Sequence, residues 1–102
     1  MIHVIATIRL APGSRPAFLE EFRKLTPLVR AEAGCVEYGA AVDEPTGIPV
    51  QELAGEDAVV VVEKWESADA LRAHLAAPHM ADYRTRVKDY VKGVTLRVLR
   101  PA

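Results

Sequence analysis

Four consecutive valines, at positions 59–62, restrict the fold of this chain more than any other feature of its sequence. They lie within the segment AVVVVEKW at positions 58–65, and β-branched side chains of this kind fit the pleated surface of a sheet. A run that is apolar on both faces is typical of a buried central strand. Alternation places Glu63 and Trp65 on one face of this strand and Val60, Val62 and Lys64 on the other.

Hydrophobic periodicity and turn-forming residues place the other elements. Apolar residues that recur at strand spacing predict three more strands, at residues 2–10, 35–42 and 94–99. Helical spacing predicts helices at about residues 14–33, 67–77 and 80–91, and Ser14 and Ser67 are good caps for the first two. Gly93 is expected to end the last helix. Residues 43–57 are rich in turn formers and predict a loop, in which residues 50–53 could add a short strand.

This order of elements predicts an α+β fold of the ferredoxin-like split βαβ type, in one domain spanning residues 1–102. Helices then cover one face of an antiparallel sheet, and the other face stays bare. The first strand and the valine run direct apolar residues toward that bare face, so a monomer would expose a large apolar patch. We therefore expect a homodimer, because a two-fold partner is the natural cover.

Charge and composition exclude several classes of function. With 13 basic and 14 acidic residues the net charge is −1, and no basic cluster suits a nucleic-acid backbone. No apolar run approaches the ~20 residues needed to cross a bilayer, and the first ten residues do not resemble a signal peptide. We expect a cytoplasmic protein that binds neither nucleic acid nor membrane. Cys35 is the only cysteine, so an intrachain disulfide and a CxxC motif are both excluded.

Four segments in this order and spacing resemble the antibiotic biosynthesis monooxygenase family: VIATIRLAPG at 4–13, EAGCVEY at 32–38, EKWES at 63–67 and HLAAPHM at 74–80. Within that family the chain is most similar to bacterial quinol monooxygenases that act on menadiol-like substrates. The resemblance implies a dimeric α/β barrel and O2 chemistry on a quinol-like aromatic substrate, without a metal or an organic cofactor.

The chain departs from the haem-degrading branch of the same superfamily, which uses an Asn, a Trp and a haem-ligating His. It contains no Asn at all, His74 stands where that Trp would align, and Arg84 lies near the ligand position. Haem degradation is therefore disfavoured.

His74 is the first candidate for a catalytic residue. Oxidation of a quinol begins with removal of a phenolic proton, and imidazole is the side chain best suited to accept it near neutral pH. His74 lies beside Leu71 and Leu75 on a covering helix and should point toward the sheet. The alternative is a partly buried histidine with only a structural role.

Trp65 and Tyr83 complete the catalytic set that we expect. Trp65 could form a flat wall for an aromatic ring and offer its indole N–H to a substrate oxygen, or it could be an ordinary core tryptophan. Tyr83 shares a helical stripe with Met80 and Val87 and is a second hydrogen-bond donor.

Four further residues are candidates for substrate binding. Glu63 could orient His74 or fix its tautomer, although an edge or interface carboxylate is the stronger alternative. Tyr38 could line the cavity or face the dimer interface. His79 is expected at the rim, at the start of a helix, and Arg84 could hold an anionic group.

A metal site is the alternative use of the histidines, because His74, His79 and Glu63 formally make a 2-His-1-carboxylate set. Pro78 interrupts the chain between the two histidines and should scatter them, so no metal site is expected.

Two other functions stay open. One is isomerisation of a small enolisable or phosphorylated carbonyl compound by a histidine base, with Arg9 or Arg84 holding the phosphate. The other is a dimer without catalytic activity that binds a small apolar metabolite or a partner.

Overall fold

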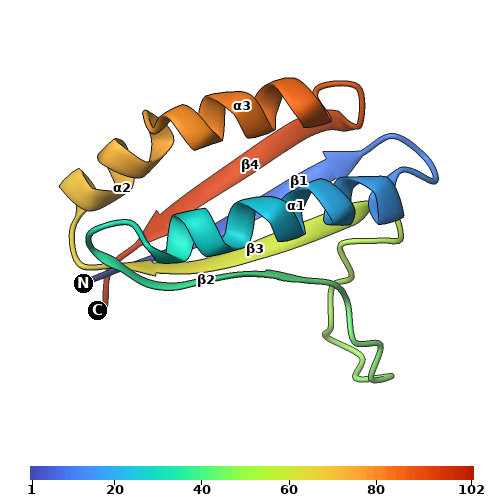
Figure 1. The fold of residues 1–102 in the computed structure, drawn as a ribbon. Helices are drawn as coiled ribbons and strands as arrows, with labels where there is room; N and C mark the ends of the chain where they lie inside the picture. The colour runs from blue at the N-terminus through green and yellow to red at the C-terminus, as the bar shows by residue number, and fades with distance from the viewer.

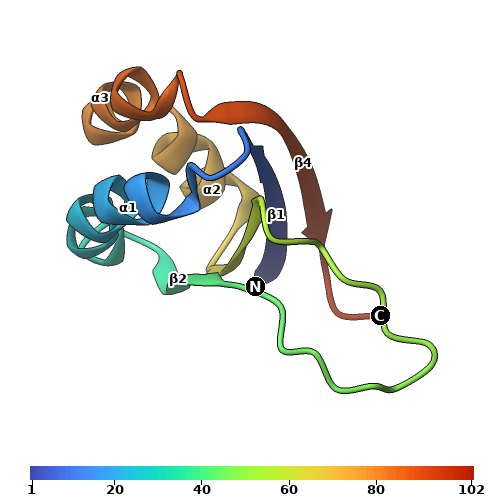
Figure 2. The same ribbon diagram turned by 90° about the vertical axis from the view of Figure 1, so that its right-hand side faces the viewer.

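The structure is a computed structural model that describes residues 1–102, and it confirms the α+β prediction. Four strands form one antiparallel sheet in the order β2-β3-β1-β4, and three helices cover one face of it (Figures 1 and 2). The elements are β1 (Ile2–Leu10), α1 (Arg15–Arg30), β2 (Cys35–Ala41), β3 (Ala58–Trp65), α2 (Ala68–Leu75), α3 (Pro78–Val87) and β4 (Val91–Leu99).

The valine run forms β3, which has the predicted bounds and lies between β2 and β1. Its side chains alternate as expected: Val59, Val61 and Glu63 are buried beneath the helices, whereas Val62 is largely exposed on the other face. β1 also matches its prediction and pairs with both β3 and β4. The two strands with the clearest patterns therefore occupy the middle of the sheet.

The core lies between this sheet and the helices. From α1, the stripe Phe18, Phe22, Leu25 and Val29 is buried at the spacing that the sequence predicts. Each such side chain contributes about 1.5–3 kcal/mol when it leaves water. The ring of Phe22 stacks on Tyr38 of β2, with ring centroids 5.4 Å apart. α1 thereby fixes the edge of the sheet that carries Tyr38.

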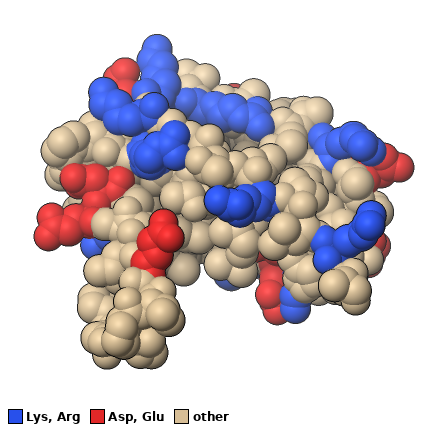
Figure 3. Space-filling model, turned by 180° about the vertical axis from the view of Figure 1, so that it is seen from behind, with Lys and Arg blue, Asp and Glu red and all other residues tan.

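The bare face of the sheet, which no helix covers, carries Ile5, Val60 and Val62; Val62 is exposed, and the other two are half-buried. Figure 3 looks onto this side of the molecule, where several Lys and Arg side chains gather at the upper left and uncharged atoms cover much of the remainder. Residues 42–57 form an extended arm that projects from the sheet (Figures 1 and 2), and Val50 within it is 91% exposed. No helix of the structure has the length and apolar character that crossing a membrane requires.

Three boundaries differ from the sequence predictions. Residues 50–53 form no strand, because the arm has no neighbouring backbone to pair with and is closed by side-chain bonds such as Thr46 Oγ1 to Gln51 Oε1 at 2.6 Å. α3 begins at Pro78 and ends at Val87. Gly93 ends no helix and lies inside β4, where an added Cβ would collide with the Arg9 guanidinium. Close approach of a neighbouring group explains this glycine better than helix termination does.

Candidate functional site

A cavity of about 440 Å³ lies between the sheet and the helices α2 and α3. Its lining is mostly apolar, with contributions from the sheet, from α1 and from both of these helices. Among the residues that line it, those with titratable or hydrogen-bonding side chains are Tyr38, Glu63, His74, Tyr83, Arg84 and Lys88. An apolar cavity with a few convergent polar groups is the usual form of a small-molecule site.

His74 lies on α2 and points into the layer between helix and sheet, as the sequence predicts. The helix begins where the Ser67 hydroxyl accepts a hydrogen bond from the Ala70 amide, and His74 follows two turns later, only 2% exposed. Its Nδ1 lies 2.8 Å from Oε2 of Glu32. Every fully buried polar side-chain atom has a partner, so Nε2 of His74, which bonds no protein group, opens onto the cavity.

The protonation state of His74 follows from its surroundings. Burial lowers the pKa of His74, and the hydrogen bond and charge of Glu32 offset part of that shift. Imidazole is then neutral at pH 7, and a carboxylate that accepts from Nδ1–H selects the tautomer with a free lone pair on Nε2. The arrangement is that of a base whose acceptor atom faces the cavity.

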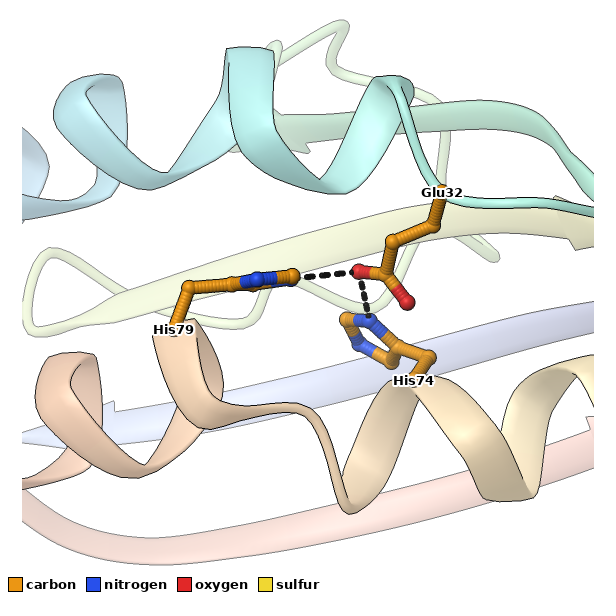
Figure 4. A group of neighbouring side chains, drawn as sticks. All are labelled: Glu32, His74 and His79. Carbon is orange, nitrogen blue, oxygen red and sulfur yellow. Dashed lines mark hydrogen bonds and ion pairs between the residues drawn. The ribbon is translucent and has the colours of Figure 1, made fainter.

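Glu32 joins both histidines of this region, and sequence reasoning did not assign it any role. It lies in the turn after α1, while His79 opens α3, and Figure 4 shows both rings directed at the same carboxylate. Nε2 of His79 lies 2.8 Å from the same Oε2 that His74 contacts. The orienting role expected of Glu63 therefore falls to Glu32. Its one signal in the sequence is its place in the segment EAGCVEY at 32–38.

The expectation that Pro78 scatters the histidines is wrong. α2 ends at Leu75 and α3 starts at Pro78, and this short break turns His79 back toward His74. One donor atom from each of Glu32, His74 and His79 lies within 4.8 Å of the other two. These three residues, and not the set with Glu63, could hold a metal ion.

Trp65 differs from its prediction. It is completely buried behind His74, at 4.6 Å between ring centroids, and it does not line the cavity. Its indole Nε1–H donates to Glu63 Oε1 at 2.9 Å, so the expectation that this N–H is available to a substrate is wrong. Trp65 supports the His74 ring from the core side.

Glu63 is buried on the same strand and lines the cavity. Burial raises the pKa of Glu63 and the charge of Glu32 adds to this, although the hydrogen bond from Trp65 acts in the opposite direction.

Tyr38 and Tyr83 both line the cavity. The ring of Tyr38 meets His74 edge to face, at 5.5 Å between centroids, and Tyr83 packs against Phe18 and Phe22. Burial raises the pKa of both phenols, so they remain protonated donors. Neither hydroxyl bonds a protein group, and neither counts among fully buried atoms without a partner, so both reach the open space.

The remaining candidates for substrate binding are Arg84 and His79. Arg84 lines the rim and donates to the Leu75 carbonyl at 2.9 Å. His79 lies outside the cavity, which does not favour the direct substrate contact expected of it. Burial raises the pKa of the Cys35 thiol, so this cysteine stays protonated.

Comparisons with known proteins agree on one family. The sequence profile of the antibiotic biosynthesis monooxygenase family matches residues 1–86. The Escherichia coli protein named "Probable quinol monooxygenase YgiN" is 43% identical over 103 residues, which cover 99% of this chain and 98% of the relative. The crystal structure of PA3566 from Pseudomonas aeruginosa is 27% identical and superposes with a TM-score of 0.78 over 99% of this chain and 94% of the other. That of Rv0793 from Mycobacterium tuberculosis is also 27% identical, with a TM-score of 0.79 and the same coverage.

Proposed function

Because this chain belongs to the antibiotic biosynthesis monooxygenase family, we propose that it oxidises a quinol-like aromatic compound with O2 in the cavity beneath α2 and α3. The observation that carries this proposal is the orientation of His74, whose Nδ1 is held by Glu32 while Nε2 opens onto an apolar cavity. The printed name of the E. coli relative supports a quinol as the class of substrate.

His74 is the general base of this proposal. Its Nε2 takes the phenolic proton, because a quinolate gives an electron to O2 far more readily than a neutral quinol does. A free phenol pKa of about 10 and a free imidazole pKa of about 6.5 differ by roughly 3.5 units, or about 5 kcal/mol. Burial lowers the pKa of His74 and widens this gap. The Glu32 carboxylate stabilises the imidazolium, and the Tyr38 and Tyr83 hydroxyls can donate to the quinolate oxygen. Together these contacts reduce the free-energy cost of moving the proton from the quinol to His74.

The overall reaction balances without an additional reductant. One oxygen atom of O2 enters a ring C–H bond of the quinol, and the other leaves as water. The quinol itself supplies both electrons and becomes a hydroxyquinone. The protein then has to bind the ring, remove the proton and exclude bulk water, all of which side chains can do.

Two basic residues at the rim favour a second candidate function. Arg84 and Lys88 line the cavity and could hold an anionic group, so isomerisation of a phosphorylated enolisable carbonyl compound by the same His74 is the alternative. A proton-exchange assay on such a carbonyl compound under anaerobic conditions separates it from oxidation, because isomerisation consumes no O2.

We also infer that the chain forms a homodimer through the bare face of the sheet, as a dimeric α/β barrel requires. Val62 is 42% exposed there beside the half-buried Ile5 and Val60, and apolar patches of this kind usually mark an interface. Sedimentation equilibrium should give twice the mass of the chain. A monomer at all concentrations would contradict the inference.

The experiment that tests the proposed function is O2 uptake by metal-free protein with menadiol, after subtraction of spontaneous oxidation. We expect uptake above background in the wild type and almost none in His74→Ala. Arg72→Ala is the matched control, because the Arg72 side chain is 74% exposed on α2, pairs with Asp69 and does not line the cavity. No enhancement with several quinols, or an equal rate in folded His74→Ala, would refute the proposal.

A further inference from the structure

Glu32, His74 and His79 bring two ring nitrogens and one carboxylate oxygen to a common point beside the cavity (Figure 4). We propose that these three residues bind a single Zn²⁺ ion, and that the ion switches off His74 as a base. Zinc binding stands on the geometry alone, whereas the inhibitory effect rests on the proposed function.

The distances suit zinc after a small adjustment. Nδ1 of His74 and Nε2 of His79 each lie 2.8 Å from Glu32 Oε2, and all three atoms lie within 4.8 Å of one another. Tetrahedral zinc with bonds of about 2.0–2.1 Å places its ligand atoms about 3.3 Å apart. The two histidines therefore need to approach each other by less than about 1.5 Å, which rotation of the side chains can provide.

The donor set has the chemistry that zinc prefers, because imidazole nitrogen and carboxylate oxygen are both common zinc ligands. Without metal, the two N–H groups point at Oε2. To bind the ion, each ring moves its proton to its other nitrogen, so the ligands stay neutral imidazoles and Glu32 stays a carboxylate. Arg84 is the opposing positive charge that acts on His74.

Solvent can reach the three proposed ligand atoms from one side. The side chains of His79 and Glu32 are 25% and 13% exposed, whereas His74 is buried. Solvent can therefore deliver the ion and supply a water as its fourth ligand. Of the three residues only His74 lines the cavity, so the ion lies behind the base and does not touch the substrate.

Inhibition follows from the tautomer. When Nδ1 of His74 binds the ion, the ring proton must lie on Nε2, the atom that faces the cavity. The base then becomes a hydrogen-bond donor and can no longer accept a phenolic proton. Zinc would thus control the same residue that the proposed reaction depends on.

The binding test is calorimetric titration of metal-free protein with Zn²⁺ in the absence of any substrate. We expect one ion per chain in the wild type, and affinity at least about tenfold weaker in Glu32→Gln and His79→Gln. Asp69→Asn is the matched control, because this carboxylate is 91% exposed and pairs with Arg72, and the variant should bind like the wild type. Circular dichroism checks that each variant is folded. No binding by the wild type, or folded His79→Gln that binds equally well, would overturn the site.

A Co²⁺ titration followed by visible absorption gives a second measurement of the site itself. Cobalt held by nitrogen and oxygen ligands in a tetrahedral site absorbs strongly, and His79→Gln should weaken this signal. An unchanged spectrum in that variant would exclude His79 as a ligand.

The inhibitory effect is tested separately by O2 uptake with menadiol at saturating Zn²⁺. Uptake should fall to background and return when a chelator removes the ion. Zinc that binds without changing uptake would overturn the inhibition and leave the site intact. If the metal-free protein has no quinol activity, the titration still decides whether the site exists.

Discussion

Replacement of Glu32 by Gln tests the support that His74 receives from its carboxylate. When His74 accepts a proton, the new imidazolium faces the Glu32 charge across a hydrogen bond of 2.8 Å. Unit charges whose centres lie about 4 Å apart attract by about 4 kcal/mol at an effective dielectric constant of about 20. Because Glu32 is 13% exposed and glutamine can still accept the hydrogen bond, we expect roughly half of this to be lost.

A loss of about 2 kcal/mol corresponds to a fall of roughly 30-fold in kcat. The assay is steady-state O2 uptake with menadiol by metal-free Glu32→Gln protein. Glu20→Gln is the matched control, since that carboxylate on α1 is 70% exposed, pairs with Arg23 and should leave kcat unchanged. A kcat for Glu32→Gln within about twofold of the wild type would refute the electrostatic reasoning.

Three further substitutions test two residues that line the cavity and one glycine in the turn after α1. Tyr83→Phe removes a hydroxyl with no protein partner, so kcat/KM should fall about 3- to 10-fold, near 1 kcal/mol, with the melting temperature unchanged; equal kcat/KM would remove Tyr83 from the site. Glu63→Gln keeps an acceptor for Trp65 and removes a buried charge. Since burial raises the pKa of Glu63 above 4.5, its stability contribution is full below that pH and lost as pH rises through the folded-state pKa. The variant should therefore be more stable than the wild type in urea at neutral pH, with the gain disappearing in acid, and a variant less stable at neutral pH would contradict this. Gly34→Ala places a Cβ 2.6 Å from that of Ala70 at a φ of +83°, so thermal unfolding should show a loss of about 2 kcal/mol or more, and an unchanged melting temperature would contradict it.

Local sequence patterns predicted the sheet well because alternate residues of a strand face the core, so that apolar residues recur at every second position. The bounds of β1 follow from this alternation, those of β3 from its continuous valine run, and the buried stripe of α1 from helical spacing. The prediction that Gly93 ends a helix was wrong because glycine also occurs where another group approaches a strand closely. Here that group is the side chain of Arg9, which is far away in the sequence.

Local periodicity also predicted part of the site. His74 and Tyr83 lie on helical stripes that periodicity places against the sheet, and both line the cavity. Glu32 lies 42 residues from His74, and no local pattern connects a turn after one helix with the last turn of another. The bond from Trp65 to Glu63 was within reach, since residues two apart share one face of a strand.

The most direct test of the central claim is a nitrogen NMR spectrum of metal-free protein isotope-labelled at its three histidines, recorded at neutral pH. Variants of His3 and His79 assign the His74 signals. We predict that Nδ1 of His74 carries the proton and that Nε2 does not, because Glu32 accepts from Nδ1–H. A proton on Nε2 of His74, alone or together with one on Nδ1, would contradict the assignment of His74 as a base ready to accept a substrate proton.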